Sequence, residues 1–297
     1  MIQVGRMEKG DVDAASEILF DAFGAVYRQR GHIPPFPTRD SAAWLCRAYL
    51  DLDPEGCAMA WSGNEAVGVG FAHPRGEVTS IGPLAARPGG PPGVARALMA
   101  ELGRVAAQSG SLRLFQDSFN PDSFGLYARL GYVVADVAPY LLTERLIPPA
   151  APAPAIRALR PDDIPLIERY DRARTVADRR RDLALLASTG SALIATGPPG
   201  GIAGPIRGYL FYRPLPARVV IGPGIAESAE TMAELVDGVA AALPGRAAVI
   251  RASAAAPAVL LRAFARGFRV DHLGNLMVAG PYTPPPAQLY ALFPESL

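Results

Sequence analysis

Residues 120–134 read NPDSFGLYARLGYVV, and this stretch predicts a short helix between two strands. Asn120 is of the residue type that forms local turns and caps. The segment 123–130 is expected to be helical, and the apolar residues of 132–146 are expected to form the strand that closes a sheet. A further strand is predicted just before it, at 111–118 (SLRLFQDS). The stretch therefore predicts a strand–helix–strand unit in a mixed sheet.

The residues upstream predict the rest of that sheet. Apolar periodicity and glycine-containing turns indicate a strand at 2–6, helices at 11–25 and 40–51, strands at 57–62, 66–73 and 77–85, and a helix at 93–108. This order predicts a mixed α/β (α+β) fold, in which a mostly antiparallel sheet contains one strand–loop–helix crossover.

The second half of the chain repeats the first. SIGPLA at 80–85 is echoed by VIGPGIA at 220–226, and LYARLGYVV at 126–134 by LLRAFARGFRV at 260–270. We therefore predict two domains of one kind, each a mostly antiparallel sheet flanked by helices. Their expected bounds are 1–147 and 158–297, with a Pro/Ala-rich linker at 148–157 and extra loop in the first copy around 28–50.

Composition excludes several classes of protein. The net charge is +1, so no overall positive field would recruit nucleic acid. Apolar runs are too short for a membrane span and no signal peptide is visible, so we expect a soluble, cytoplasmic protein. Two cysteines and three scattered histidines (Cys46 and Cys57; His32, His73 and His272) argue against a disulfide framework and against any metal centre.

The stretch 88–102, PGGPPGVARALMAEL, leads into the predicted helix at 93–108. Its glycines allow a backbone to approach a phosphate closely, and N–H groups at a helix start are good phosphate donors. Pro91 and Pro92 have no N–H to donate. The loop therefore predicts either a phosphate cradle with few donors or a rigid turn before a helix.

These two stretches, in this order of elements, resemble the GNAT superfamily of acyl-CoA-dependent N-acyltransferases, and the repeat resembles a tandem member. Residues 120–134 match the signature N-x-x-A-x-x-L-Y-x-x-x-G-F/Y, with Ser123 in place of alanine. In the loop, Gly93 and Ala95 match the second half of the pattern R/Q-x-x-G-x-G/A, while Gly90 stands where Arg or Gln is usual. The resemblance covers the first half of the chain well and the second half weakly.

The resemblance implies an acetyl-CoA co-substrate, no metal and an amine acceptor. It implies that Tyr127 is the acid that protonates the leaving thiolate. Glu77 is one candidate for the base, with His73 or Asp117 behind it, and each also fits a plain solvated side chain. The expected cofactor-binding residues are Leu84, Ala85, Ala86, Gly89, Gly90, Gly93, Val94, Ala95, Arg96, Asn120, Ser123 and Tyr127.

The second copy lacks these residues. Glu227 and Glu230, expected in the first turn of its helix, would repel a pyrophosphate, and Ala263 stands at the position of Tyr127. We expect a degenerate copy, retained for packing, for shaping the acceptor cleft or as a homodimer surface. The segment 196–208 is expected to be a flexible hairpin loop, and 178–182 (DRRRD) an exposed helical face in which Asp178 pairs with Arg181.

Three functions remain open on the sequence. The first is direct acetyl transfer from acetyl-CoA to a small-molecule or peptide amine in the first domain. The second is a non-catalytic protein that binds or senses acyl-CoA, and the third is a purely structural partner protein. The loop at 27–38, YRQRGHIPPFPT, lies where this superfamily often covers the acceptor, and its charges fit either an anionic acceptor or a solvated loop.

Overall fold

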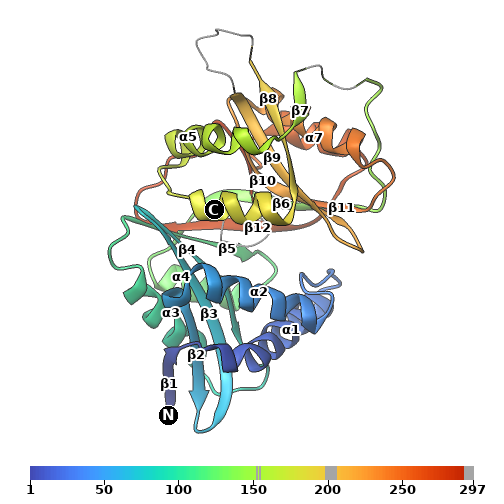
Figure 1. The fold of residues 1–297 in the computed structure, drawn as a ribbon. Coiled ribbons are helices and arrows are strands. Elements are labelled where there is room, and N and C mark those ends of the chain that lie inside the picture. Colours follow the sequence, from blue (N-terminus) through green and yellow to red (C-terminus); the bar gives the residue numbers. More distant parts are fainter. Residues whose placement is uncertain (152, 154, 198–205, 291–297) are drawn as a thin grey trace.

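The chain forms one continuous mixed sheet with helices on both faces (Figure 1). The computed structural model describes residues 1–151, 153, 155–197 and 206–290. In these residues the sheet has 13 strands in the order β1-β2-β3-β4-β5-β12-β6-β11-β13-β10-β9-β8-β7. The parallel neighbours among them are β4 with β5 and β10 with β11, and the other pairs are antiparallel. The predicted fold class, a mixed and mostly antiparallel sheet flanked by helices, is confirmed.

The first half contains the elements that periodicity predicted, with ends that differ by a few residues. They are β1 (Ile2–Arg6), α1 (Val12–Gln29), α2 (Arg39–Leu52), β2 (Cys57–Ser62), β3 (Glu65–Arg75), β4 (Val78–Ala86), α3 (Val94–Val105), β5 (Ser111–Asp117), α4 (Pro121–Arg129) and β6 (Val133–Thr143). Short 3₁₀ turns lie at Lys9–Asp11 and Pro54–Gly56.

The second half repeats this order and adds one strand. Its elements are β7 (Ile156–Ala158), a 3₁₀ turn (Pro161–Asp163), α5 (Ile164–Thr175), α6 (Arg180–Thr189), β8 (Ser191–Thr196), β9 (Ile206–Pro214), β10 (Val219–Ala226), α7 (Ala229–Ala242), β11 (Ala248–Ala252), α8 (Pro257–Ala265), β12 (Arg269–Ala279) and β13 (Ala287–Tyr290). Helices α4 and α8 both have nine residues, so Ala263 occupies the position of Tyr127. β8 and β9 are antiparallel neighbours, as a hairpin requires. Residues 198–205 of its loop lie outside the described residues, as do residues 152 and 154 of the expected linker.

The extra length of the first copy is distributed differently from the expectation. Residues 40–50 belong to α2, which has a counterpart in α6, so they are not an inserted loop. The first copy is longer because α1 has 18 residues where α5 has 12, because α2 has 14 where α6 has 10, and because a longer segment joins α1 to α2.

Alternation along the strands explains why helices cover both faces. Successive side chains of a strand point to opposite faces of the sheet. On β2, Cys57 and Met59 pack beneath α1 and α2, whereas Ala58 and Ala60 pack beneath α3. β8 divides its side chains between α5 and α7 in the same way in the second half.

The two halves exchange strands where they meet. β12, from the second half, lies between β5 and β6 of the first half, and β6 pairs on its other edge with β11 of the second half. Figure 1 shows β12 crossing the junction. Residues 133–143 do form a strand of the sheet, but β6 does not pair with β5, because β12, from more than 120 residues further along the chain, lies between them.

Each half contains one pair of parallel strands, at equivalent positions, whose members diverge after three residues of pairing. β4 pairs with β5 at Val78–Ser80, and in the described residues the pairing goes no further, because a register shift follows on β4. β10 pairs with β11 at Val219–Ile221 and shifts register in the same way. In the second half β13 enters this opening and pairs with both strands, whereas in the first half the opening is a cavity.

Residues 178–182 are not the exposed helical face expected from their charges. Arg179 and Asp182 are buried, and Asp178 pairs with Arg180 rather than with Arg181. Asp182 accepts hydrogen bonds from Arg75 of β3, at 2.6 Å for one pair, and so joins the two halves. Charge alone predicted exposure here because the partner that neutralises Asp182 is distant in sequence.

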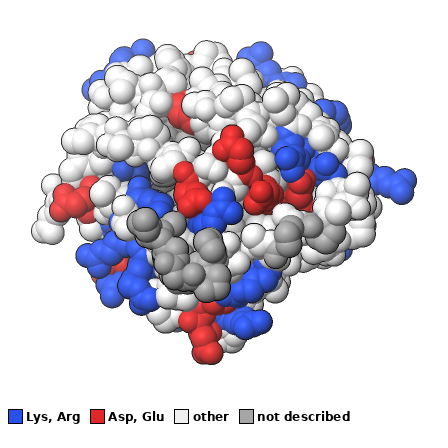
Figure 2. Space-filling view, turned by 90° about the horizontal axis from the view of Figure 1, so that it is seen from above, with Lys and Arg blue, Asp and Glu red and all other residues white. Residues whose placement is uncertain are grey.

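The outer face of the second half carries basic and acidic side chains side by side (Figure 2). This distribution agrees with the near-zero net charge of the chain. Within the described residues, none of the helices combines the length and the apolar character needed to cross a bilayer.

Candidate active site

Two adjoining cavities open where β4 and β5 diverge. One has a volume of about 350 Å³ and the other about 120 Å³. Both are lined by residues of α1, β4, β5 and α4, namely Phe23, Tyr27, Leu84, Asp117, Asn120, Ser123 and Tyr127. A group bound in one cavity would therefore lie against a group bound in the other.

The larger cavity contains much of the expected cofactor-binding set. Its walls include Leu84, Ala85, Ala86, Ala95, Asn120, Ser123 and Tyr127. Gly89, Gly90, Gly93 and Arg96 are exposed on the loop and the first turn of α3, and Val94 is buried beneath that turn. The predicted residues thus lie along one path, from the end of β4 past the start of α3 to α4.

The loop before α3 leaves the start of that helix open to a ligand. Gly93 is the N-cap residue at a φ of +91°, a left-handed conformation that favours glycine, and no side chain caps the helix. The first N–H groups of a helix have no partner within it. The Arg87 guanidinium is held by Glu17 and the Ala66 carbonyl, whereas Arg96 is exposed beside the helix start.

Tyr127 lies at the boundary of the two cavities. Its side chain is buried, and among the described residues its hydroxyl has no hydrogen-bond partner. Burial raises the pKa of Tyr127, so its hydroxyl remains protonated near neutral pH. A protonated, unpaired hydroxyl that faces a cavity is able to donate a proton or a hydrogen bond to a bound molecule.

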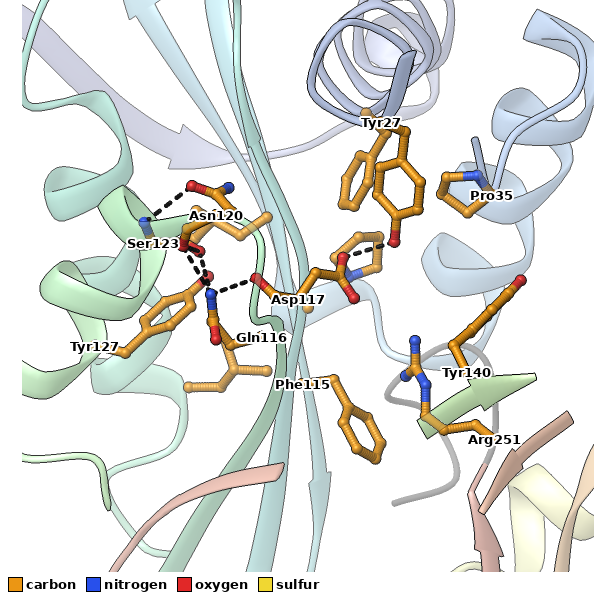
Figure 3. A pocket seen from close by; sticks show the side chains of 15 residues that line it. Tyr27, Pro35, Phe115, Gln116, Asp117, Asn120, Ser123, Tyr127, Tyr140 and Arg251 are labelled. Carbon is orange, nitrogen blue, oxygen red and sulfur yellow. Dashed lines mark hydrogen bonds between the residues drawn. The ribbon is translucent and has the colours of Figure 1, made fainter. Parts of the chain in front are cut away.

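Local hydrogen bonds position α4 and therefore Tyr127. Asn120 caps the helix, because its Oδ1 accepts from the Ser123 N–H at 3.3 Å. The Gln116 amide donates to the Asn120 carbonyl at 2.7 Å and to the Ser123 hydroxyl at 3.1 Å (Figure 3). Asn275 of β12 in turn donates to Gln116, so the exchanged strand supports this arrangement.

Asp117 is the carboxylate that lines both cavities, whereas Asp122 lines only the larger one. The Tyr27 hydroxyl donates to its Oδ2 at 2.6 Å (Figure 3), and His272 Nε2 lies 3.3 Å from its Oδ1. Burial alone would raise the pKa of Asp117, but the hydrogen bond with His272 and the charge of Arg251 outweigh burial and lower that pKa. Asp117 is therefore ionised near neutral pH and is a weak base.

The structure does not bring the other two candidate bases to the cavities. Glu77 is exposed at the turn between β3 and β4, at the opposite end of β4 from the opening. His73 is fully buried, with Nδ1 2.7 Å from Asp53 and Nε2 3.2 Å from the Gly82 carbonyl. Of the three residues considered for the base, Asp117 lines the cavities.

Four further residues of the site lie outside the motifs of the sequence. Tyr27, from α1, lines both cavities, and Tyr140 of β6 and Arg251 of β11 line the smaller one. His272 reaches Asp117 from β12. No local pattern marks these residues. Arg251 and His272 reach the opening of the first half because β11 and β12 pair with its strands.

The histidines also meet, although they are far apart in sequence. His32, from the segment between α1 and α2, lies against His272, with ring centroids 5.0 Å apart. The wide spacing of these two histidines in the sequence therefore does not keep their side chains apart in the fold.

Solved structures similar to this chain share its whole fold. A putative acetyltransferase from Pyrococcus horikoshii matches with a TM-score of 0.76 and 16% identity, over 99% of this chain and 95% of that chain. A GCN5-related N-acetyltransferase from Sphaerobacter thermophilus matches with a TM-score of 0.61 and 15% identity, over 95% and 97% of the two chains.

A tandem GNAT protein from the clavulanic acid biosynthesis pathway, solved without AcCoA, matches with a TM-score of 0.60 and 15% identity, over 95% of this chain and 100% of that chain. No protein-family model matches the sequence, and no curated protein matches it significantly. At these identities the likeness concerns the fold. Over nearly its whole length, the chain has the fold of these solved structures, which include a GCN5-related N-acetyltransferase and a tandem GNAT protein.

Proposed function

We propose that the chain is an N-acyltransferase that moves an acetyl group from acetyl-CoA to an amine in its first half. The observation that carries this proposal is the unpaired Tyr127 hydroxyl at the boundary of two cavities that meet between β4 and β5. The similarity of the fold to solved acetyltransferases supports it. In this proposal residues 1–147 form the catalytic domain, 148–157 the linker and 158–297 the second copy.

The larger cavity would hold the donor. The pyrophosphate of acetyl-CoA would bind the open N–H groups at the start of α3, with Arg96 beside them. The acyl carbonyl would lie against the end of β4, where backbone N–H groups near Leu84–Ala86 would stabilise its developing negative charge. Pro91 and Pro92 have no N–H group, so most hydrogen bonds to the pyrophosphate would come from the N–H groups at the start of α3.

The smaller cavity would hold the acceptor amine. The ionised Asp117 carboxylate would attract its ammonium form, and the amine would attack after losing a proton to solvent or to this weak base. The C–N bond forms as the C–S bond breaks, the nitrogen gives up its remaining extra proton to solvent, and Tyr127 gives its proton to the leaving thiolate. The tyrosinate then regains a proton from solvent.

The second copy would not bind acetyl-CoA. β13 enters the opening between β10 and β11, which corresponds to the cavity of the first half. The start of α7 is capped by its own Ser228 side chain, which accepts from the Thr231 N–H, and Glu230 adds a negative charge there. These features support a degenerate copy that shapes the site of the first half through β11 and β12.

The test is acetyl transfer from acetyl-CoA to a panel of small-molecule and peptide amines, with Tyr127→Phe as the variant. We expect the variant to lower kcat by roughly 10²–10⁴-fold and to leave acetyl-CoA affinity unchanged, because it removes a proton donor and little else. Tyr132→Phe is the matched control, since Tyr132 is also buried but does not line either cavity.

Equal rates for wild type and Tyr127→Phe would refute the assignment of the acid. Calorimetric binding of acetyl-CoA without turnover on any amine would instead favour a sensing protein. That alternative has support in Pro91 and Pro92 and in Gly90, which stands where the pattern has Arg or Gln.

A further inference from the structure

Three side chains with metal-binding groups meet at the junction of the two halves. They are His32, from the segment between α1 and α2, and Asp271 and His272 of β12. The Asp271 Oδ2 atom lies 3.1 Å from His32 Nδ1 and 2.8 Å from His272 Nδ1. Each of the three residues offers a ligand atom within 4.8 Å of the other two. The cluster therefore consists of two imidazole nitrogens around one carboxylate oxygen.

The backbone of β12 is irregular at this point, and the irregularity brings adjacent side chains together. Consecutive residues of a regular strand point to opposite faces of the sheet. The pairing of β12 with β6 shifts register between Val270 and His272, which leaves Asp271 out of the ladder. The shift lets Asp271 and His272 direct their ligand atoms to one place, as bulges beside functional sites do.

The donor set and its spacing fit a tetrahedral transition-metal ion. Zinc binds histidine nitrogen and carboxylate oxygen at about 2.0–2.2 Å, so two such ligands of a tetrahedral ion lie roughly 3.3–3.5 Å apart. The two pairs at 2.8 and 3.1 Å would need to spread by about 0.2–0.7 Å to reach these separations. The ligand atoms of His32 and His272, which lie within 4.8 Å of each other, would need to move closer together. Three protein ligands would leave a fourth position for water.

Further contacts hold the two histidine rings in place, and one of these contacts is of a kind that metal-bound histidines commonly make. A metal-bound histidine commonly donates its other ring N–H to a carboxylate. His272 Nε2 lies 3.3 Å from Asp117 Oδ1, and the other oxygen of Asp117 is held by Tyr27. The His272 ring stacks on Tyr140 at 4.7 Å between centroids, and the His32 ring stacks on Phe119 at 4.6 Å.

We propose that His32, Asp271 and His272 bind one divalent cation of the zinc class. Asp271 and His272 are supplied by the second half and His32 by the first, so the ion ties the segment between α1 and α2 to the exchanged strand. His272 connects the ion to Asp117, which lines both cavities. The metal thus fixes the acceptor side of the site and joins the two halves.

Metal binding to the full-length, tag-free, chelator-treated chain tests the proposal. Cobalt(II) is the probe, because its visible absorption reports a site with histidine and carboxylate ligands, and zinc should displace it. We expect one equivalent to bind, and we expect the melting temperature to rise with zinc concentration because the ligand binds the folded state. Background binding will be low, since the chain has three histidines and the third, His73, is fully buried.

Two variants remove single ligands without large changes of the core. We expect His32→Gln and Asp271→Asn each to lower cobalt affinity by at least tenfold. The His32 side chain is 18% exposed, so its variant is the one expected to fold normally. Asp178→Asn is the matched carboxylate control and should bind like wild type, since Asp178 pairs with Arg180 elsewhere in the second half.

Failure to saturate with cobalt at millimolar concentration would overturn the proposal, as would wild-type affinity in both ligand variants. These readouts do not use acetyl transfer. A failure to bind cobalt would therefore leave the proposed acyltransferase activity untouched. A failure to transfer acetyl groups would likewise leave the proposed metal site untouched.

Discussion

At Gly56 a single hydrogen atom in place of a side chain permits the approach of two strands. Gly56 ends the 3₁₀ turn that leads into β2, and a Cβ atom built there would lie 1.8 Å from the Ala72 carbonyl oxygen of β3. Backbone cannot move aside as the end of a flexible side chain can. The position therefore requires glycine for reasons of space.

We predict that Gly56→Ala lowers the free energy of unfolding by about 3 kcal/mol or more, because β2 and β3 must separate locally. Gly103→Ala is the matched control. A Cβ at Gly103 meets nothing within 4 Å in α3, so this change should raise stability by up to about 1 kcal/mol through helix propensity. Urea unfolding of both variants measures this, and a Gly56→Ala midpoint equal to wild type would contradict the reasoning.

At the scale of elements, the openings beside β4 and β10 distinguish the two copies. The opening of the first half borders two cavities and the uncapped start of α3. In the second half β13 pairs with both edges of the opening, and Ser228 caps α7. A strand that satisfies both edges removes the space and the donors that a bound cofactor would use.

We predict that isothermal titration calorimetry finds one acetyl-CoA bound per chain. Gly93→Val should weaken this binding by at least tenfold, because a φ of +91° is strained for valine and the start of α3 must shift. Ser228→Ala, the corresponding change at α7, should leave the affinity unchanged while costing about 1 kcal/mol of stability. A stoichiometry of two would show that the second opening is available after all.

At the scale of the whole molecule, the halves are joined by exchanged strands and by a buried ionic network. Arg75 of β3 bonds both Asp182 of α6 and Asp53, and Asp53 also contacts His73. Burial alone would raise the pKa of Asp53, but the hydrogen bonds from His73 and Arg75 outweigh it and lower that pKa to about 2. Burial raises the pKa of Asp182. Protonation of Asp182 at low pH therefore favours the folded state, whereas protonation of Asp53 disfavours it.

The folded-state pKa of Asp53 is below its ordinary value of 3.8, so its stabilising contribution is complete above about pH 4 and is lost as pH falls toward 2. We predict that this contribution is about 2 kcal/mol. Asp53→Asn should therefore lose less unfolding free energy than wild type between pH 4 and pH 2.

Urea unfolding at a series of pH values measures the difference. Asp51→Asn, an exposed change two residues away on α2, should keep the wild-type pH dependence. If the unfolding free energy of wild type and of Asp53→Asn changed equally with pH, groups other than Asp53 would cause the loss of stability in acid.

The sequence by itself determined what depends on nearby residues. Apolar periodicity, glycine and proline located the helices and strands, and the Asn120-to-Tyr132 signature located α4 and Tyr127 between β5 and β6. The repeated order revealed the duplication. These features are local, because a helix or strand is selected by side chains a few positions apart.

The tertiary structure alone decided which strands became neighbours and hence what the site contains. β6 and β12 have equivalent positions in their copies, so no local pattern specifies that they exchange partners or that β13 closes only the second opening. Asp117 therefore received Tyr27 and His272 as partners, and His32 met Asp271, through contacts between segments up to about 240 residues apart. Backbone hydrogen bonding is the same for any compatible edge, so the choice of partner depends on how the whole chain packs.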